Sequence, residues 1–124
     1  MLILKTRWFH RWARKTSLSD TTLLAAVAEM ERGLIGDALG GFVFRKRVAL
    51  PGTGKRGSTR TIVVYKRGAK VFFMFGYAKN ARSNISPNEL KALKRVAAKL
   101  LAEPPAALEK AINDGELIEV SANG

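Results

Sequence analysis

The 124-residue sequence contains no cysteine, which excludes disulfides, a thiolate zinc site and a cysteine nucleophile. No apolar run approaches the roughly 20 residues that a membrane-spanning helix needs, so no membrane partner is expected. The start, MLILKTRWFHRW, places its apolar run before its basic residues, the reverse of a secretory signal. No group of His, Asp and Glu has metal-ligand spacing. We therefore expect a cytoplasmic protein without metal or cofactor.

Acidic residues are missing from one long stretch of the chain. Between Ala38 and Asn88 there are eleven Lys and Arg residues and no Asp or Glu. The whole chain carries a net charge of +12, with a pI near 10.6. A balance this basic predicts a polyanionic partner, namely a nucleic acid, an anionic membrane or an acidic protein. Because an ordinary soluble surface mixes its charges, the one-sign stretch favours a phosphate-binding surface over a merely solvated one.

The length and composition predict one folded domain. A chain of this length suits a single domain, since domains usually take roughly 100–200 residues. Hydrophobic residues make up 47% of it, enough for a core. We expect one domain over residues 1–124, with residues 104–124 as a short C-terminal appendage.

Hydrophobic spacing and helix-capping residues predict the order of elements. Strands are expected at 2–5, 42–50, 59–66 and 71–78, and helices over 6–15, after Ser17 or Ser19, and over 86–103. Ser86 and Glu89 form a capping box, and DALGG at 37–41 is expected as a turn. A further short helix and a possible strand end the chain. The expected class is α+β: a small antiparallel sheet, made of the N-terminal strand and a three-stranded meander. Two N-terminal helices and a C-terminal helix pack mainly on one face of it.

The segment PGTGK, residues 51 to 55, is similar to a nucleotide-binding phosphate loop. That motif needs a first glycine, a hydroxyl residue after the lysine and a helix that follows. Here Ala49 and Arg56 occupy the first and last of those positions, and a strand-like segment, TRTIVVYK, comes next. A nucleoside triphosphatase is therefore excluded. The segment is expected as a glycine-rich basic hairpin loop, either on a nucleic-acid backbone or solvated.

A longer stretch is similar to a known family. The residues LGGFVFRKRVALPGTGKRGSTRTIVVYKRGAKVFFMFGYAKNARSNISPNELKALK, Leu39 to Lys94, resemble the RelE/HigB-type toxins of bacterial type II toxin–antitoxin systems. The shared pattern is an L-G-G turn, a basic strand, P-G-x-G-K, a strand-start Arg, F-x-x-G-[FY]-A-K, and N-I-S before a helix. The resemblance implies a small α+β toxin domain, a cognate antitoxin as partner, and metal-independent cleavage of mRNA in the ribosomal A site.

The chemistry of such a cut fits the residues present. RNA is cut when its 2′-OH attacks the neighbouring phosphate, which requires proton transfer and cations that stabilise the charged intermediate. The resemblance supplies the candidate catalytic residues Arg60, Lys55, Lys79 and Arg82. The candidate RNA-binding residues are Lys46, Arg47, Arg56 and Tyr77. Tyr77 is a candidate for base stacking, and the alternative is a core aromatic of the sheet.

One departure from the family pattern leaves alternatives open. Several relatives carry a Tyr or His near the C-terminus, whereas this chain has neither after Tyr77. The single histidine, His10, belongs to the first helix with Trp8, Phe9 and Trp12, which are expected in the core rather than as a base-stacking platform. Proton transfer then falls to Lys and Arg. The alternatives to an endoribonuclease are a ParE-like toxin that inhibits gyrase and a nucleic-acid-binding module without activity.

Overall fold

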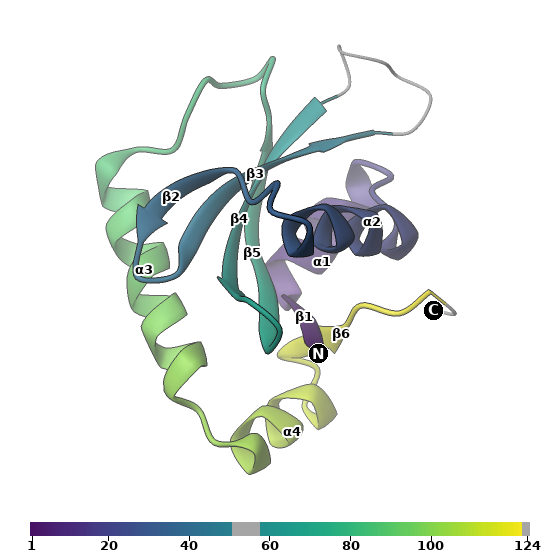
Figure 1. Cartoon of the computed structure of the whole chain (residues 1–124), viewed down its shortest axis with the longest axis vertical. Coiled ribbons are helices and arrows are strands. Elements are labelled where there is room, and N and C mark those ends of the chain that lie inside the picture. Colours follow the sequence, from purple (N-terminus) through teal and green to yellow (C-terminus); the bar gives the residue numbers. More distant parts are fainter. Residues whose placement is uncertain (51–57, 123–124) are drawn as a thin grey trace.

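The structure is a computed structural model that describes residues 1–50 and 58–122. Within these residues the chain forms a six-stranded sheet with four helices (Figure 1). The elements are β1 (Leu2–Thr6), α1 (Arg7–Lys15), α2 (Asp20–Glu31), β2 (Asp37–Gly40), β3 (Val43–Ala49), β4 (Ser58–Lys66), β5 (Lys70–Ala78), α3 (Pro87–Ala102), α4 (Pro105–Asn113) and β6 (Leu117–Glu119). The expected α+β class is confirmed, as is the place of each expected helix.

The strands lie in the order β2-β3-β4-β5-β1-β6. The predicted antiparallel meander is present as β3, β4 and β5. The N-terminal strand corrects the expectation of a purely antiparallel sheet, because β1 pairs with β5 in parallel, from Leu2 opposite Lys70 to Lys5 opposite Phe73. Parallel neighbours need a long connection, and here α1, α2 and the strands β2 to β4 lie between the two strands in the chain.

Both edges of the sheet contain a strand beyond the N-terminal strand and the three-stranded meander. The segment predicted as a turn at 37–41 instead begins with the short edge strand β2, which pairs with β3. Its glycines Gly40 and Gly41 have positive φ values and make the turn into β3. At the opposite edge the terminal strand predicted from the sequence is present as β6, which pairs with β1, so the C-terminal segment expected as an appendage completes the sheet.

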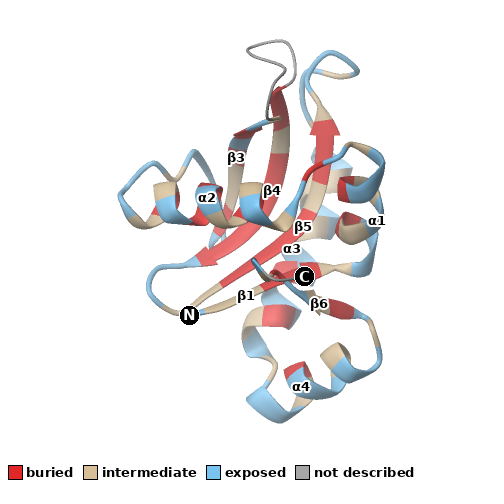
Figure 2. Ribbon diagram, turned by 90° about the vertical axis from the view of Figure 1, so that its right-hand side faces the viewer, coloured by how far each residue is buried: buried red, intermediate tan, exposed pale blue. Residues whose placement is uncertain are grey.

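Helices cover both faces of the sheet, rather than mainly one as expected. Figure 1 shows α3 on one side of the strands and α1 and α2 on the other. The reason is the alternation along β4, where Val63 and Tyr65 pack in one apolar cluster and Ile62 and Val64 in another. Two apolar faces both need cover. Figure 2 shows the resulting burial along β4 and β5, and the prediction that β5 is covered on both faces is confirmed.

Local signals place the helix ends. Ser19 rather than Ser17 caps α2, accepting a hydrogen bond from the amide of Thr22. The predicted capping box of α3 is present, with Ser86 and Glu89 bonded reciprocally. Within the described residues, no helix combines the length and apolar character needed to cross a bilayer.

The aromatic face of α1 follows the expectation only in part. Phe9 is fully buried and Trp12 partly, whereas Trp8 is 47% exposed. The physical reason is its place at the start of α1. There β1 has ended, and the side chain lies beside Phe75 with no further strand to cover it.

Candidate functional site

A row of three polar side chains crosses the α3 face of the sheet at the end where β3 and β4 are joined. Arg47 on β3 lies opposite Arg60 on β4, and Arg60 lies opposite Tyr77 on β5. Directly opposed residues project to the same face of a sheet, about 5 Å apart from strand to strand. Ile62, two residues after Arg60, packs in the apolar cluster beneath α3, which fixes the face. We call Arg47, Arg60 and Tyr77 the Arg60 row.

The centre of the Arg60 row holds two buried polar atoms without partners. Within the described residues, neither Nη1 of Arg60 nor Oη of Tyr77 has a hydrogen-bond partner. Tyr77 is only 4% exposed, so its hydroxyl is not simply solvated. An unmet buried donor costs about 1–3 kcal/mol, more for a charged group. Both atoms can donate to the oxygens of an anion, which would remove that cost.

The charges around the Arg60 row also favour an anion. Arg47 is exposed, Arg60 is half-buried, and they oppose one another directly across β3 and β4. Like charges in this position destabilise a sheet. A phosphate between them would turn the repulsion into two charge-assisted contacts, and arginine suits this because its planar guanidinium matches the geometry of phosphate oxygens.

Arg82 reaches the same place from the turn after β5. Its guanidinium carbon lies 5.3 Å from the ring centre of Tyr77 and 5.9 Å from that of Phe75. The ring of Tyr77, buried and covered in this way, leaves no face on which a base can stack. The structure therefore supports the core-aromatic alternative for that ring, and the hydroxyl is the part of Tyr77 that has no partner among the described residues.

An ion pair holds Arg82 in position. Its guanidinium bonds the carboxylate of Glu89, in the first turn of α3, and the backbone oxygen of Asn84 at 3.1 Å. The hydrogen bond from Arg82, followed by that from the amide of Ser86, lowers the pKa of Glu89 from 4.5 to about 2. The same pair raises the pKa of Arg82. Glu89 thus caps α3 and orients a candidate catalytic cation.

The low pKa of Glu89 predicts a pH-dependent stability. The carboxylate is ionised in the folded protein down to about 2, so its stabilisation is complete above 4.5 and is lost as pH falls from 4.5 towards 2. We expect Glu89→Gln to lower the free energy of unfolding at neutral pH, and this deficit to shrink in acid. Urea unfolding of both proteins across this range measures it, with Glu109→Gln, on α4, as the charge-matched control. If Glu89→Gln lowers the free energy of unfolding equally in acid and at neutral pH, the stabilising ion pair between Glu89 and Arg82 is contradicted.

The remaining candidate residues differ in where the structure places them. Lys46 lies on the opposite face, 6% exposed, with its ammonium 2.8 Å from Glu29 of α2. It belongs to the packing of α2 and is removed from the candidate RNA-binding set. Lys79 is exposed just after β5. Lys55 and Arg56 lie outside the described residues.

The sequence pattern did not single out two residues that support the Arg60 row. Arg45, on the same face of β3, bonds Asp37 at 2.9 Å and Asn84 at 2.6 Å and so ties β2 and the turn after β5 together. Glu89 was recognised only as a cap. Arg45 could have been found from the sequence, because it lies two residues before Arg47 on the same strand and so shares its face. The ion pair of Glu89 could not, because it depends on the path of the turn after β5, which the sequence does not specify.

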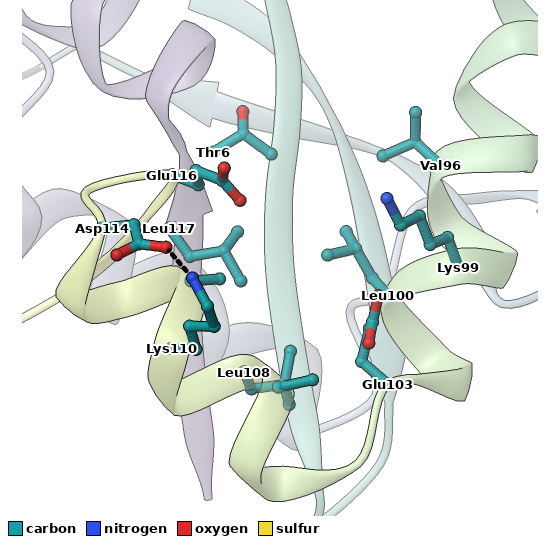
Figure 3. Close-up of a pocket in the computed structure, with 12 residues that line it drawn as sticks. Thr6, Val96, Lys99, Leu100, Glu103, Leu108, Lys110, Asp114, Glu116 and Leu117 are labelled. Atoms are coloured by element: carbon teal, nitrogen blue, oxygen red, sulfur yellow. Dashed lines mark hydrogen bonds and ion pairs between the residues drawn. The ribbon is translucent and has the colours of Figure 1, made fainter.

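A separate hollow of about 400 Å³ lies between α3, α4 and the end of β1. Figure 3 shows Leu100, Leu108 and Leu117 pointing into it, with Lys110 paired to Asp114 at its rim. None of the candidate RNA-binding or catalytic cations that the structure describes lines it. Its apolar floor and mixed charges do not suit a phosphate, so it is not the predicted site.

Comparison with known proteins bears on the whole chain. A search of curated proteins found no match. A protein-family model described as "RelE toxin of RelE / RelB toxin-antitoxin system" matches residues 1–120. That span contains every strand and helix described above, together with the complete Arg60 row. The chain therefore belongs to the RelE toxin family and is a RelE-type toxin of a toxin–antitoxin system.

Proposed function

We propose that this toxin is a metal-independent endoribonuclease that cuts mRNA on the ribosome and so stops translation. The observation that carries the proposal is the buried Nη1 of Arg60, which has no partner among the described residues and lies in the row with the equally unpartnered hydroxyl of Tyr77. Two preorganised donors beside two further arginines, Arg47 and Arg82, suit a phosphate whose negative charge grows during reaction.

The reaction needs no group beyond RNA and the protein. The 2′-oxygen attacks the adjacent phosphorus, the bond to the 5′-oxygen breaks, and the products are a 2′,3′-cyclic phosphate and a 5′-hydroxyl. In this mechanism Arg60 and Tyr77 donate to the non-bridging oxygens as their charge increases. Arg47 and Arg82 add positive charge from either side, and Glu89 keeps Arg82 in position.

Two proton transfers complete the reaction: one from the 2′-hydroxyl and one to the leaving 5′-oxygen. Arginine is always protonated and cannot accept the first proton. His10 is on α1, which covers the other face, and burial lowers its pKa. We assign the transfers to Lys79 and Lys55, the two lysines among the candidate catalytic residues, since a positioned amine can pass a proton to or from a reacting oxygen. Arg56 is assigned a phosphate contact, as expected for a cation of the glycine-rich loop sequence.

The family also indicates the partners. A RelE-type toxin has a cognate antitoxin that holds it inactive. We propose mRNA and the ribosomal A site as its targets, and the cytoplasm as the place where it meets them. The net charge of +12 suits both, because ribosome and message are polyanions and the antitoxin can match the charge with acidic side chains.

Induced expression without the antitoxin tests the proposal. We expect growth to stop with a rapid fall in amino-acid incorporation, and new mRNA 5′ ends inside coding regions. A DNA-damage response with intact mRNA would replace the proposal with gyrase inhibition. Unchanged growth from a folded, soluble protein would support a binding module without activity.

A further inference from the structure

We propose that Trp8 is a base-stacking subsite for the RNA strand bound at the Arg60 row. The inference rests on the proposed function and names a second contact for the same substrate. Trp8 lies in the first turn of α1, beside the part of β5 that β1 no longer covers. Its ligand would be an unpaired nucleotide flanking the scissile phosphate.

The exposure of Trp8 is the first observation. Nearly half of this side chain is exposed, at 47%, although it is among the largest apolar side chains. It is held flat rather than free, because its ring stacks on Phe75 at 4.5 Å and 25° and lies nearly parallel to Trp12 at 15°. A fixed, partly open indole is what a base needs as a stacking platform.

Continuous contacts join Trp8 to the Arg60 row. Phe75 and Tyr77 are two residues apart on β5 and share the α3 face, which places them about 7 Å from each other along the strand. The guanidinium of Arg82 lies over both rings. A strand of RNA with its phosphate at Arg60 therefore passes Arg82 and Phe75 before it reaches Trp8.

Trp8 can stack on a base, which the buried ring of Tyr77 cannot. Tyr77 is buried beneath Arg82, and Phe75 lies between Arg82 and Trp8. Phe42, the other large aromatic that is exposed, belongs to the turn between β2 and β3 and makes no ring contact with this group. Among the described aromatics, only Trp8 combines exposure with contact to the path from Arg60.

Cations lie beside Trp8 on the same helix. Arg11 and Lys15 follow it at three and seven residues, so they lie along one stripe of α1. Both are exposed, and neither forms an ion pair with any described residue; with Arg14 they line a shallow hollow. An aromatic platform beside unpaired cations is typical of single-stranded nucleic-acid binding, whereas bases within a duplex are not open to stacking.

Fluorescence tests the contact directly. The chain has two tryptophans, so Trp12→Phe leaves Trp8 as the only one. A fully 2′-O-methylated single-stranded oligoribonucleotide cannot be cut and serves as the probe. We expect it to quench Trp8 on binding, and a duplex of the same sequence to quench little. Absence of quenching at saturating single strand would overturn the proposal.

Affinity supplies the second readout. Stacking of one base predicts that Trp8→Ala weakens binding of the same oligonucleotide about 5- to 150-fold. Trp8→Leu, which keeps an apolar contact with Phe75, should bind as weakly as Trp8→Ala, and Trp8→Phe should restore most of the loss. Binding by Trp8→Leu equal to that of the unaltered protein would overturn the proposal. So would variants that bind RNA normally but lose affinity for the antitoxin. Thermal unfolding confirms that each variant is folded.

The salt dependence of RNA affinity tests whether Arg11 contacts a phosphate. Arg11→Ala should reduce the slope of log affinity against log salt by about 0.7, the value for one lost contact to a single strand. Arg32→Ala, an equal charge loss at the C-terminal end of α2, should leave the slope unchanged. Equal slopes in both variants would remove Arg11 from the subsite.

The Trp8 subsite and the nuclease activity can fail separately. Quenching of Trp8 without any RNA cleavage would overturn the nuclease activity and keep the Trp8 subsite. Cleavage without quenching would overturn the Trp8 subsite and keep the nuclease activity.

Discussion

Arg60→Ala is expected to lower the rate of RNA cleavage about 100- to 1000-fold, the usual effect of removing one preorganised donor from a developing oxyanion. The same change should not lower the thermal midpoint, and a small rise is expected. Arg60 has an unsatisfied nitrogen and opposes Arg47, so its removal relieves a repulsion and an unmet donor together. Single-turnover cleavage of ribosome-bound mRNA and thermal unfolding measure the two effects.

Lys46→Met is the matched control for Arg60→Ala. Lys46 lies opposite Thr61, the neighbour of Arg60 on β4, yet it points to the other face and pairs with Glu29. Losing its charge should leave cleavage within a few-fold of the original, although the distance along the strand is small. Comparable activity losses in the two variants would mean that net charge, rather than the Arg60 row, controls the reaction.

Gly76→Val is expected to lower the free energy of unfolding by about 2–3 kcal/mol, the upper part of the range for overpacking. A Cβ at this position would lie 2.3 Å from the ring of Trp12, far inside van der Waals contact. Valine otherwise favours strands, so the loss measures the clash rather than strand propensity. Urea unfolding followed by circular dichroism gives the value.

A double-mutant cycle separates the clash from other causes. In a Trp12→Leu background the added valine meets a smaller side chain, so Gly76→Val should cost clearly less there. Equal costs in the two backgrounds would show that Trp12 is not what excludes a side chain from position 76. The glycine of the F-x-x-G-[FY] pattern then has a packing reason: it lets α1 approach β5 closely enough to place Trp8 beside Phe75.

Local chemistry made much of the fold predictable. Ser86, Pro87 and Glu89 specify the start of α3 through short-range bonds, and the apolar residues at both parities of β5 indicated burial on two faces. The parallel pairing of β1 with β5 and the edge strand β2 were not predictable in this way. Both depend on partners distant in sequence, and DALG has too little apolar character to be recognised as a strand.

The candidate site was predictable in composition but not in geometry. The acid-free stretch and the family pattern indicated Arg47, Arg60, Tyr77 and Arg82, and the strand register brings the first three into one row. Lys46 was included because neighbouring strand residues look alike in sequence, although they point to opposite faces. The core role of Tyr77 and the exposure of Trp8 depend on where β1 ends and how Arg82 folds back, which no local pattern specifies.

The most direct test of the account is the chemistry of the ends that the toxin leaves on RNA. Purified toxin should cut ribosome-bound mRNA in the presence of a chelator and leave 2′,3′-cyclic phosphate and 5′-hydroxyl ends. A 2′-O-methyl group on the nucleotide before the cut should abolish the reaction. Products with 3′-hydroxyl and 5′-phosphate ends, or cleavage that the chelator stops, would contradict a cationic face that holds the phosphate while RNA attacks itself.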